Sequence, residues 1–243
     1  MNTLSPAYRI FPLGDSAITA DFGNCIDETI NREVIARFTQ LQKHPLPGMI
    51  EAVPAYSSLT IYYDMVALKR RITGSLTLFE WMQQQLNERL QQPVSYTEVK
   101  ERLINIPVCY EGEFAPDIQQ LAAAKSITVE EVTQLHISKS YKVYMLGFLP
   151  GFAYMGKVDE KISMPRKPVP VNMVPGSVGI AGLQTGIYPM ASPGGWQVIG
   201  RTPLKLFDAD REEPALLAAG DRVQFYSINK DEFETISKRE EDN

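Results

Sequence analysis

Three polar side chains, His136, Arg166 and Gln184, offer chemistry that a small polar substrate would need. Histidine changes its charge nearest neutral pH, so His136 could act as a general acid or base, or orient a substrate amide. The planar guanidinium of Arg166 could hold a carboxylate or a phosphate. Gln184 lies between Gly182 and Gly186, where its amide could meet a substrate carbonyl because the glycines let the backbone come close. These three residues are the candidate catalytic residues.

Two of these candidates also have a structural interpretation. His136 falls on the same face of a predicted helix as Val129 and Val132, and this pattern favours a histidine packed in the core or at an interface. Arg166 lies in a proline-rich loop, where a solvated surface charge is equally compatible with the sequence. The sequence therefore leaves the roles of both residues open.

A turn-rich stretch from residue 144 to residue 203 combines aromatic side chains with a few polar ones. Aromatic groups supply contact area and sparse polar groups supply orientation, so this mixture is typical of a pocket or an interface. The aromatic side chains could instead fill the interior of a barrel. The predicted substrate- or partner-binding residues are Phe148, Phe152, Tyr154, Ser177, Tyr188, Trp196 and Arg201. We expect one pocket near a partner interface, formed by His136, Arg166, Ser177, Gln184 and Tyr188.

The sequence lacks the motifs of a self-sufficient enzyme. It contains no Gly-x-x-x-x-Gly-Lys-Ser/Thr phosphate loop and no Gly-x-Ser-x-Gly nucleophile elbow. Its two histidines and two cysteines have no metal-ligand spacing, so we predict no metal site. We expect that the chain alone binds no nucleotide.

Composition and charge exclude further classes of protein. A net charge of -5 leaves no basic surface for nucleic acid or for an anionic membrane. No run approaches the roughly 18 apolar residues that span a bilayer, and the N-terminus lacks a basic segment followed by an apolar one. We therefore expect a cytoplasmic protein in which Cys25 and Cys109 are reduced.

The first part of the chain alternates strands and helices. Apolar residues at period two predict strands and helical spacing predicts helices, in the order strand 16–22, helix 27–43, strands 49–53 and 59–63, helix 76–90 and strand 103–108. With an extra leading strand, this β-α-β-β-α-β order is typical of a ferredoxin-like α+β sandwich. The polar stretch 91–100 marks a boundary, so we predict an α+β domain at residues 1–95.

The second part of the chain is richer in turns. Two short helices are expected at 117–124 and 128–138, the second opened by a capping box of Thr128 and Glu131. Ten of the 16 glycines and eight of the 17 prolines then lie between residues 147 and 203. Short strands punctuated by turns predict a β-barrel at 96–230, followed by a charged flexible tail at 231–243. Pro-Gly pairs predict type II turns with a positive φ at glycine, at 47–48, 150–151, 175–176 and 193–194.

Several motifs resemble one protein family along nearly the whole chain. The resemblance is carried by Val-Tyr-Met-Leu-Gly-Phe-Leu-Pro-Gly-Phe at 143–152, Gly-Ser-Val-Gly-Ile-Ala-Gly at 176–182, Gln-Thr-Gly-Ile-Tyr-Pro at 184–189 and Ser-Pro-Gly-Gly-Trp-Gln at 192–197. Earlier motifs agree, including Gly-Asp-Ser-Ala at 14–17, Pro-Leu-Pro-Gly at 45–48 and Ile-Pro-Val-Cys-Tyr at 106–110. The family comprises the first subunit of allophanate hydrolases, the B-type subunit of 5-oxoprolinases (PxpB) and the sporulation kinase inhibitor KipI.

The resemblance implies an α+β N-terminal domain followed by a cyclophilin-like β-barrel. It also implies a B-type subunit that works only with an A-type partner and a KipA-like, C-type partner, opening 5-oxo-L-proline to L-glutamate with ATP and magnesium. The chain has no Met-Lys-Met biotin attachment site and no Phe-His-Arg segment of active cyclophilins. The family leaves open an alternative, an inhibitor that binds the helical dimerisation domain of a sensor histidine kinase in a groove lined by Phe148, Phe152 and Tyr154.

Overall fold

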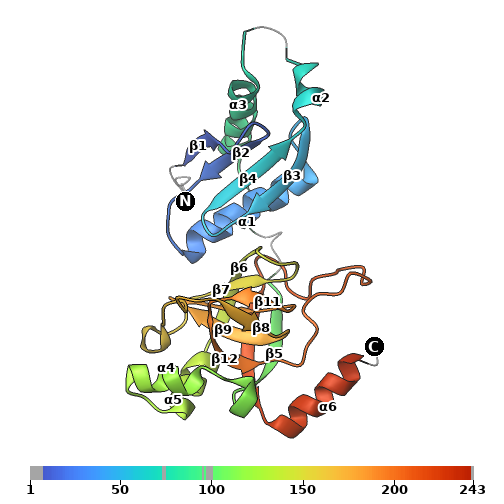
Figure 1. Ribbon diagram of the computed structural model, residues 1–243. Coiled ribbons are helices and arrows are strands. Elements are labelled where there is room, and N and C mark those ends of the chain that lie inside the picture. Colours follow the sequence, from blue (N-terminus) through green and yellow to red (C-terminus); the bar gives the residue numbers. More distant parts are fainter. Residues whose placement is uncertain (1–7, 73–74, 95, 97–100, 242–243) are drawn as a thin grey trace. The chain divides into compact units, whose positions relative to one another are not determined.

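A computed structural model of the protein describes residues 8–72, 75–94, 96 and 101–241. The chain divides into two units, Met1–Lys100 and Glu101–Asn243 (Figure 1). The division falls at the end of the polar stretch 91–100, a few residues after the boundary expected at residue 95. Each unit has its own hydrophobic core, so each is described separately below.

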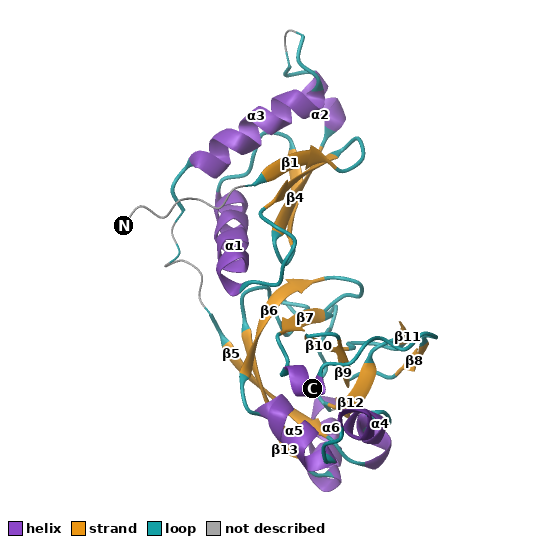
Figure 2. Ribbon diagram, turned by 90° about the vertical axis from the view of Figure 1, so that its left-hand side faces the viewer, coloured by secondary structure: helices purple, strands orange, loops and turns teal. Residues whose placement is uncertain are grey.

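The first unit is a four-stranded antiparallel sheet covered by helices. Its elements are β1 (Arg9–Pro12), β2 (Ala17–Asp21), α1 (Glu28–Lys43), β3 (Met49–Pro54), β4 (Ser58–Tyr63), α2 (Met65–Lys69) and α3 (Leu78–Gln91). The strand order in the sheet is β1-β2-β4-β3. Figure 2 shows α1 and α3 on the same side of this sheet.

Side-chain caps determine where the two long helices begin. The Asp27 carboxylate accepts hydrogen bonds from the backbone N–H groups of Thr29 and Ile30, at 2.8 and 3.0 Å, at the start of α1. Thr77 and Glu80 form a capping box at the start of α3. The apolar faces of both helices then meet the sheet in one core that includes Ile18, Val34, Leu41, Leu59, Ile61, Met82 and Leu86.

The strand predicted to complete a ferredoxin-like first domain belongs to the second unit. Residues Leu103–Cys109 form β5, a strand of the barrel, so the first unit does not complete the β-α-β-β-α-β order. The leading strand β1 instead pairs with β2 and occupies the edge of the sheet. The α+β content is as predicted, and β5 lies within the residues 96–230 that were predicted to form the barrel. The ferredoxin-like strand order is not confirmed, because a period-two pattern does not reveal which sheet a strand joins.

The second unit is a closed barrel of seven strands. These strands are β5, β6 (Ser140–Leu146), β7 (Ala153–Gly156), β9 (Ser177–Ala181), β10 (Gln184–Ile187), β12 (Gln197–Arg201) and β13 (Arg222–Ile228). Their order around the barrel is β10-β7-β6-β13-β5-β12-β9, and β9 pairs with β10 to close it. A separate two-stranded ribbon consists of β8 (Val171–Met173) and β11 (Ser192–Gly194). The predicted barrel is therefore confirmed.

Helices α4 (Ile118–Lys125) and α5 (Val129–Ile137) pack beside β12 and β13, respectively. The predicted capping box of Thr128 and Glu131 is present at the start of α5. Two short 3-10 helices, Gly112–Phe114 and Glu160–Ile162, connect other elements. Within the part of the chain that the structure describes, we find no helix with the length and apolar character that crossing a membrane requires.

The C-terminal segment forms a helix, α6 (Lys230–Glu241), where the charge pattern predicts a flexible tail. Asn229 and Glu232 exchange hydrogen bonds between side chain and backbone at its start, each 2.9 Å long. Phe233 is only 7% exposed and packs on Phe114, with ring centroids 4.4 Å apart. The prediction is wrong for residues 231–241 because one buried aromatic ring anchors an otherwise polar helix; residues 242–243 lie outside the described residues.

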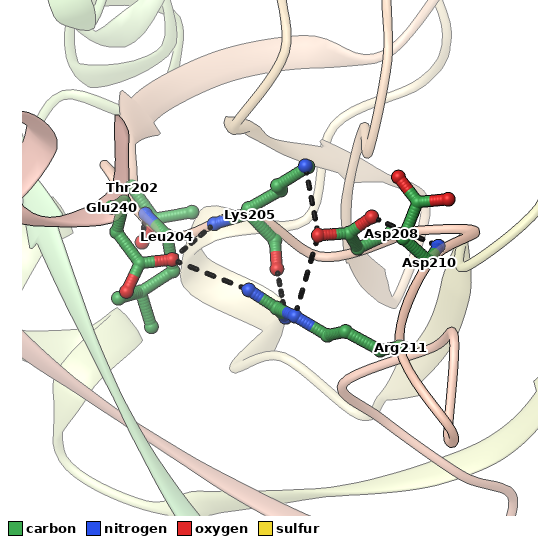
Figure 3. A network of polar contacts seen from close by, with 7 residues as sticks. All are labelled: Thr202, Leu204, Lys205, Asp208, Asp210, Arg211 and Glu240. Atoms are coloured by element: carbon green, nitrogen blue, oxygen red, sulfur yellow. Dashed lines mark hydrogen bonds and ion pairs between the residues drawn. The ribbon is translucent and has the colours of Figure 1, made fainter. Parts of the chain in front are cut away.

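Polar contacts hold the far end of α6 to the loop that follows β12. Figure 3 shows the Glu240 carboxylate, which accepts a hydrogen bond from the Lys205 backbone N–H at 3.1 Å and faces the Arg211 guanidinium. Lys205 and Arg211 both pair with Asp208, at 2.8 and 3.5 Å. Both ends of α6 are therefore attached to the barrel unit.

Candidate functional site

The barrel unit carries a pocket of about 210 Å³ whose walls are largely aromatic. We call it the aromatic pocket, and it is lined by Phe148, Phe152, Tyr154, Arg166, Pro170, Tyr188, Pro193, Gly194, Gly195 and Trp196. Five of these residues are the predicted aromatic candidates, and Arg166 is one of the three predicted catalytic residues. The structure thus gathers these aromatic side chains at a surface pocket instead of inside the barrel.

Phe152 forms the floor of the aromatic pocket. Its ring meets three other rings edge to face, with centroid separations of 4.8 Å to Tyr154, 5.2 Å to Tyr188 and 5.5 Å to Trp196. The Phe152, Tyr188 and Trp196 side chains are buried, whereas Phe148 is 61% exposed. Edge-to-face packing stabilises aromatic groups beyond their buried area and restricts each ring. The pocket is therefore a firmly packed apolar surface with an exposed aromatic rim.

The alternation of side chains along β7 places the aromatic pocket on the outside of the barrel wall. Met155 belongs to the barrel core, so Phe152 and Tyr154 point the other way. Tyr154 lies opposite Gly186 in the neighbouring strand β10. A Cβ atom at Gly186 would lie 3.1 Å from ring carbons of both Phe152 and Trp196. The absence of a side chain at Gly186 therefore leaves the space that the two rings occupy.

Gly194 has a similar role next to Tyr188. A Cβ atom at this position would lie 2.5 Å from the Tyr188 hydroxyl oxygen. Positive φ values of 72°, 79° and 83° at Gly48, Gly151 and Gly176 agree with the type II turns predicted there. Gly194 lies in β11 without a positive φ, so the turn predicted at 193–194 is wrong. Close packing, not turn geometry, requires glycine at this position.

Phe148 presents its ring at the rim from an unusual backbone conformation. Its φ is 72°, in the left-handed region that costs a non-glycine residue about 1 kcal/mol or more. The turn around it is closed by a hydrogen bond from the Gly147 N–H to the Phe152 carbonyl oxygen, 3.1 Å long. The Phe148 ring stands edge to face on Phe152, with centroids 5.7 Å apart. The turn therefore holds an exposed aromatic side chain over the pocket.

Arg166 is the charged residue of the pocket lining. Its guanidinium carbon lies 5.9 Å from the centroid of the Trp196 ring, which is a cation–π distance. Burial raises the pKa of Tyr154 and of Tyr188, although the positive charge of Arg166 acts against both shifts. Both phenols therefore stay neutral near neutral pH and keep a hydroxyl proton to donate.

The residues on either side of Arg166 are anchored to the barrel. Gln197 donates a hydrogen bond from Nε2 to the Pro165 carbonyl oxygen at 2.9 Å, and the Lys167 N–H donates to the Gly195 carbonyl oxygen at 2.6 Å. The Lys167 ammonium also pairs with the Asp117 carboxylate at 2.6 Å. This carboxylate in turn accepts a hydrogen bond from a backbone N–H of β12, also at 2.6 Å. The backbone that carries the arginine is therefore fixed.

The aromatic pocket is equipped for binding and not for acid-base chemistry. None of its lining residues is a histidine, a carboxylate or a cysteine. Among the described residues, no three or more His, Cys, Asp or Glu side chains gather where they could hold a metal ion. What the pocket offers is apolar contact area, neutral phenol groups and one permanent positive charge.

Comparisons with known proteins identify the family of the chain. Residues 8–217 match the family described as carboxyltransferase domain, subdomain C and D. The B-type subunit of the Bacillus subtilis 5-oxoprolinase is 45% identical over 93% of this chain and 95% of its own length. The chain belongs to the family of 5-oxoprolinase B-type subunits. The family member from Haemophilus influenzae is 37% identical over 89% of this chain and 96% of its own length.

Several solved structures share the fold of the chain described above. The TTHA0988 protein is 36% identical with a TM-score of 0.74, over 88% of this chain and 40% of that one. The PH0987 protein of Pyrococcus horikoshii is 39% identical with a TM-score of 0.54, over 93% of this chain and all of that one. The Kluyveromyces lactis urea carboxylase, at 20% identity and a TM-score of 0.72, shows likeness of fold over 23% of its length. The chain thus corresponds to less than half of the TTHA0988 protein.

In this member of the family, His136 lies in the core of the barrel unit and not at the aromatic pocket. Its Nδ1 and Nε2 atoms lie 2.8 Å from the Tyr110 hydroxyl and 3.0 Å from the Thr185 hydroxyl. The Thr185 hydroxyl donates to the Gly179 carbonyl oxygen at 3.1 Å, so it accepts from His136 Nε2–H. Nδ1 then accepts from Tyr110. The neutral imidazole with its proton on Nε2 satisfies every partner.

The surroundings of His136 confirm the interpretation of a packed core histidine. Its ring is fully buried and packs against both Tyr141 and Phe225, with centroids 5.3 and 4.6 Å away. Burial lowers the pKa of His136 from 6.5 to about 3. Thr185 faces this ring, so the adjacent Gln184 points to the opposite face of β10. The predicted convergence of His136 and Gln184 on one pocket is therefore wrong.

Ser177 and Arg201 are also separate from the aromatic pocket. The Ser177 hydroxyl donates to the Val174 carbonyl oxygen at 2.7 Å and so stabilises a turn. Arg201 donates from Nε to the Pro175 carbonyl oxygen at 2.8 Å, and its guanidinium lies 5.7 Å from the centre of the Phe233 ring. Arg201 lines a second pocket beside α6, also of about 210 Å³. Neither residue lines the aromatic pocket, although both were predicted to belong to the same binding site as its aromatic residues.

Sequence reasoning missed the residues that anchor the Arg166 loop. The sequence presents Asp117 only as the start of a helix, and it gives no reason to include Lys167 and Gln197 among the site residues. The Asp117 carboxylate contacts a backbone group 81 positions away, and Gln197 contacts one 32 positions away. No local pattern of residue types signals such long-range contacts.

Proposed function

We propose that this chain is the B-type subunit of an ATP-dependent 5-oxoprolinase, which opens 5-oxo-L-proline to L-glutamate together with A-type and C-type partners. The observation that carries the proposal is the 45% identity to the B-type subunit of the Bacillus subtilis 5-oxoprolinase over 95% of that protein. The Escherichia coli protein of the same name is 42% identical over 78% of its length. A match along both units favours the same role in an assembly over a shared barrel alone.

Within this complex, the chain would supply a binding surface. The aromatic pocket presents rings, neutral phenols and Arg166, but no side chain suited to act as a general base. The histidine of the barrel unit is enclosed, and both of its nitrogens are engaged. The groups that activate water and open the lactam are therefore assigned to the partners.

The aromatic pocket does not fit ATP with magnesium. Magnesium in such sites takes oxygen ligands from carboxylates, and the phosphate groups take several donors or cations. The aromatic pocket has one arginine and no carboxylate. No cluster of potential metal ligands occurs elsewhere among the described residues. We therefore assign nucleotide binding to the partner subunits.

Reconstitution from purified subunits tests the proposal. The chain alone should be inert, and a mixture with its A-type and C-type partners should hydrolyse ATP only when 5-oxo-L-proline is added and should release glutamate. Size-exclusion chromatography reports whether the three proteins assemble. Equal turnover by the isolated chain would contradict the dependence on partners. Full assembly without turnover would refute the proposed function and favour the alternative of a histidine kinase inhibitor.

A further inference from the structure

The aromatic pocket combines one permanent positive charge with an otherwise uncharged lining. Arg166 is the charged residue among those that line it. The ammonium of the adjacent Lys167 is neutralised by Asp117 at 2.6 Å, so it adds no second charge for a ligand. Arg166 is exposed at the surface of the pocket, and the apolar walls favour an apolar body. The matching ligand has a single negative charge and a small, flat framework.

The guanidinium of Arg166 is free to form that pair. None of the ion pairs among the described residues involves it, and its contact with Trp196 is through the face of the ring. A guanidinium stacked on an aromatic ring keeps its in-plane N–H donors available. These donors match the two oxygens of a carboxylate. A dianionic phosphate would need a second cation, and the lining does not provide one.

The loop around Arg166 is organised before any ligand arrives. The backbone is hydrogen-bonded to the barrel immediately before and after the arginine, at Pro165 and Lys167. The partly buried ion pair of Lys167 with Asp117 adds a third attachment. Only the side chain of Arg166 then loses freedom when a ligand binds, which lowers the entropy cost of binding.

We propose that the aromatic pocket binds small ring carboxylates of the 5-oxoproline type, with Arg166 holding the carboxylate by two parallel hydrogen bonds. The flat lactam ring lies against the aromatic walls. Asp117 and Lys167 are positioning residues, which act on the ligand through the loop that carries Arg166. The identity of the ligand rests on the proposed function, and the inference adds the residue and the interaction that recognise it.

Steady-state kinetics of the assembled complex test the role of Arg166. Arg166→Gln removes the charge but keeps a polar, shorter side chain. It should raise the KM for 5-oxo-L-proline about ten- to a hundredfold, because losing a hydrogen bond between charged groups typically weakens a binding constant by this factor. The KM for ATP should stay unchanged. Lys161→Gln, which removes an exposed charge outside the pocket, is the matched control and should leave both constants unchanged.

Fluorescence provides a direct measure of binding. The full chain carrying Trp81→Phe keeps Trp196 as its single indole, and this indole lines the pocket. Titration with 5-oxo-L-proline should change its emission at concentrations at least tenfold lower than titration with the neutral 5-oxo-L-prolinamide. Adding Arg166→Gln should abolish this preference for the acid, and Arg166→Lys should restore part of it because the charge returns without the planar fork.

The two experiments separate failure of the inference from failure of the proposed function. An active complex in which Arg166→Gln leaves the KM for 5-oxo-L-proline unchanged would overturn the inference and leave the proposed function intact. Equal binding of the acid and the amide by the wild-type pocket would overturn it as well. A wild-type complex without ATP hydrolysis dependent on 5-oxo-L-proline would instead refute the proposed function.

Discussion

His136 makes the stability of the barrel unit depend on pH. The pKa of this residue is 6.5 when exposed and about 3 in the folded protein. Between these values the unfolded chain binds a proton that the folded chain does not, so acid favours unfolding. The contribution is fully present above pH 6.5 and is lost progressively as the pH falls towards 3. One pKa unit corresponds to about 1.36 kcal/mol, so lowering the pH from 7 to 5 should remove about 2 kcal/mol.

Urea unfolding at pH 7, 6 and 5 measures this loss. In a Trp81→Phe background, the emission of the buried Trp196 reports on the barrel unit alone. His136→Gln should be less stable than its parent at pH 7, because a glutamine amide cannot reproduce the geometry of both ring nitrogens. Its stability should nevertheless fall about 2 kcal/mol less between pH 7 and 5, because the titrating group is gone. His44→Gln, which alters an exposed histidine of the first unit, is the control and should keep the full pH dependence.

Two ion-paired carboxylates of the barrel unit, Glu113 and Asp208, do not account for the same change. The pKa of Glu113 is lowered from 4.5 by its hydrogen bond with Lys230, and the pKa of Asp208 is lowered from 3.8 by its hydrogen bond with Lys205. Both groups therefore titrate below the window between pH 5 and 7. If His136→Gln lost as much stability as its parent in this window, the account of a buried neutral histidine would be wrong. The same conclusion would follow if NMR showed a protonated His136 ring in the folded protein at pH 5.

Other changes test the packing described above. Asp117→Ala should destabilise the barrel unit by about 2–3 kcal/mol, because Lys167 and the Val198 N–H lose their partner. Asp117→Asn should destabilise it less, because asparagine keeps an acceptor oxygen. Equal losses in urea unfolding would contradict this reasoning. Gly176→Ala should lower the free energy of unfolding by at least about 1 kcal/mol more than Gly182→Ala. Both glycines have a positive φ, but of the two only Gly176 lies where a Cβ atom would meet a backbone oxygen, that of Thr202. Equal thermal midpoints of the two variants would count against it. Phe233→Ala should lower the free energy of unfolding by about 3 kcal/mol and detach α6 from the barrel unit, which would appear as faster hydrogen exchange in residues 230–241. Lys238→Ala, at an exposed position of the same helix, should leave both the stability and the exchange unchanged.

The local sequence predicted the parts of the molecule that depend on neighbouring residues. Turn residues and short apolar runs indicated a barrel in the second part of the chain, and the structure has one. The spacing of His136 with Val129 and Val132 favoured a core position, which it occupies. Of the five aromatic residues that gather at the pocket, Tyr154 lies in β7 and the other four lie in segments next to strands, all within the turn-rich stretch that the sequence indicated as a pocket or an interface.

Features that depend on distant residues were not predictable in the same way. The strand at Leu103–Cys109 shows its period of two but not its partner, β13. The many charged residues of α6 predicted a flexible tail, although one aromatic residue, Phe233, packs on the barrel unit and attaches the helix to it. Gln184 and His136 are both polar and were expected to share a pocket, yet β10 separates their side chains. Long-range pairing, and not residue type, decided each of these outcomes.

The pairing of β5 with β13 has a consequence for how the protein is made. It joins the first strand of the barrel to the last, with Leu103 opposite Arg222 and Cys109 opposite Ile228. The elements of the first unit are complete by Gln91, so that unit can fold as soon as it leaves the ribosome. At about 5–20 residues per second, β5 then waits on the order of ten seconds for its partner. A nascent or truncated chain that lacks β13 exposes the unpaired edges of β5 and β6, which are open to aggregation.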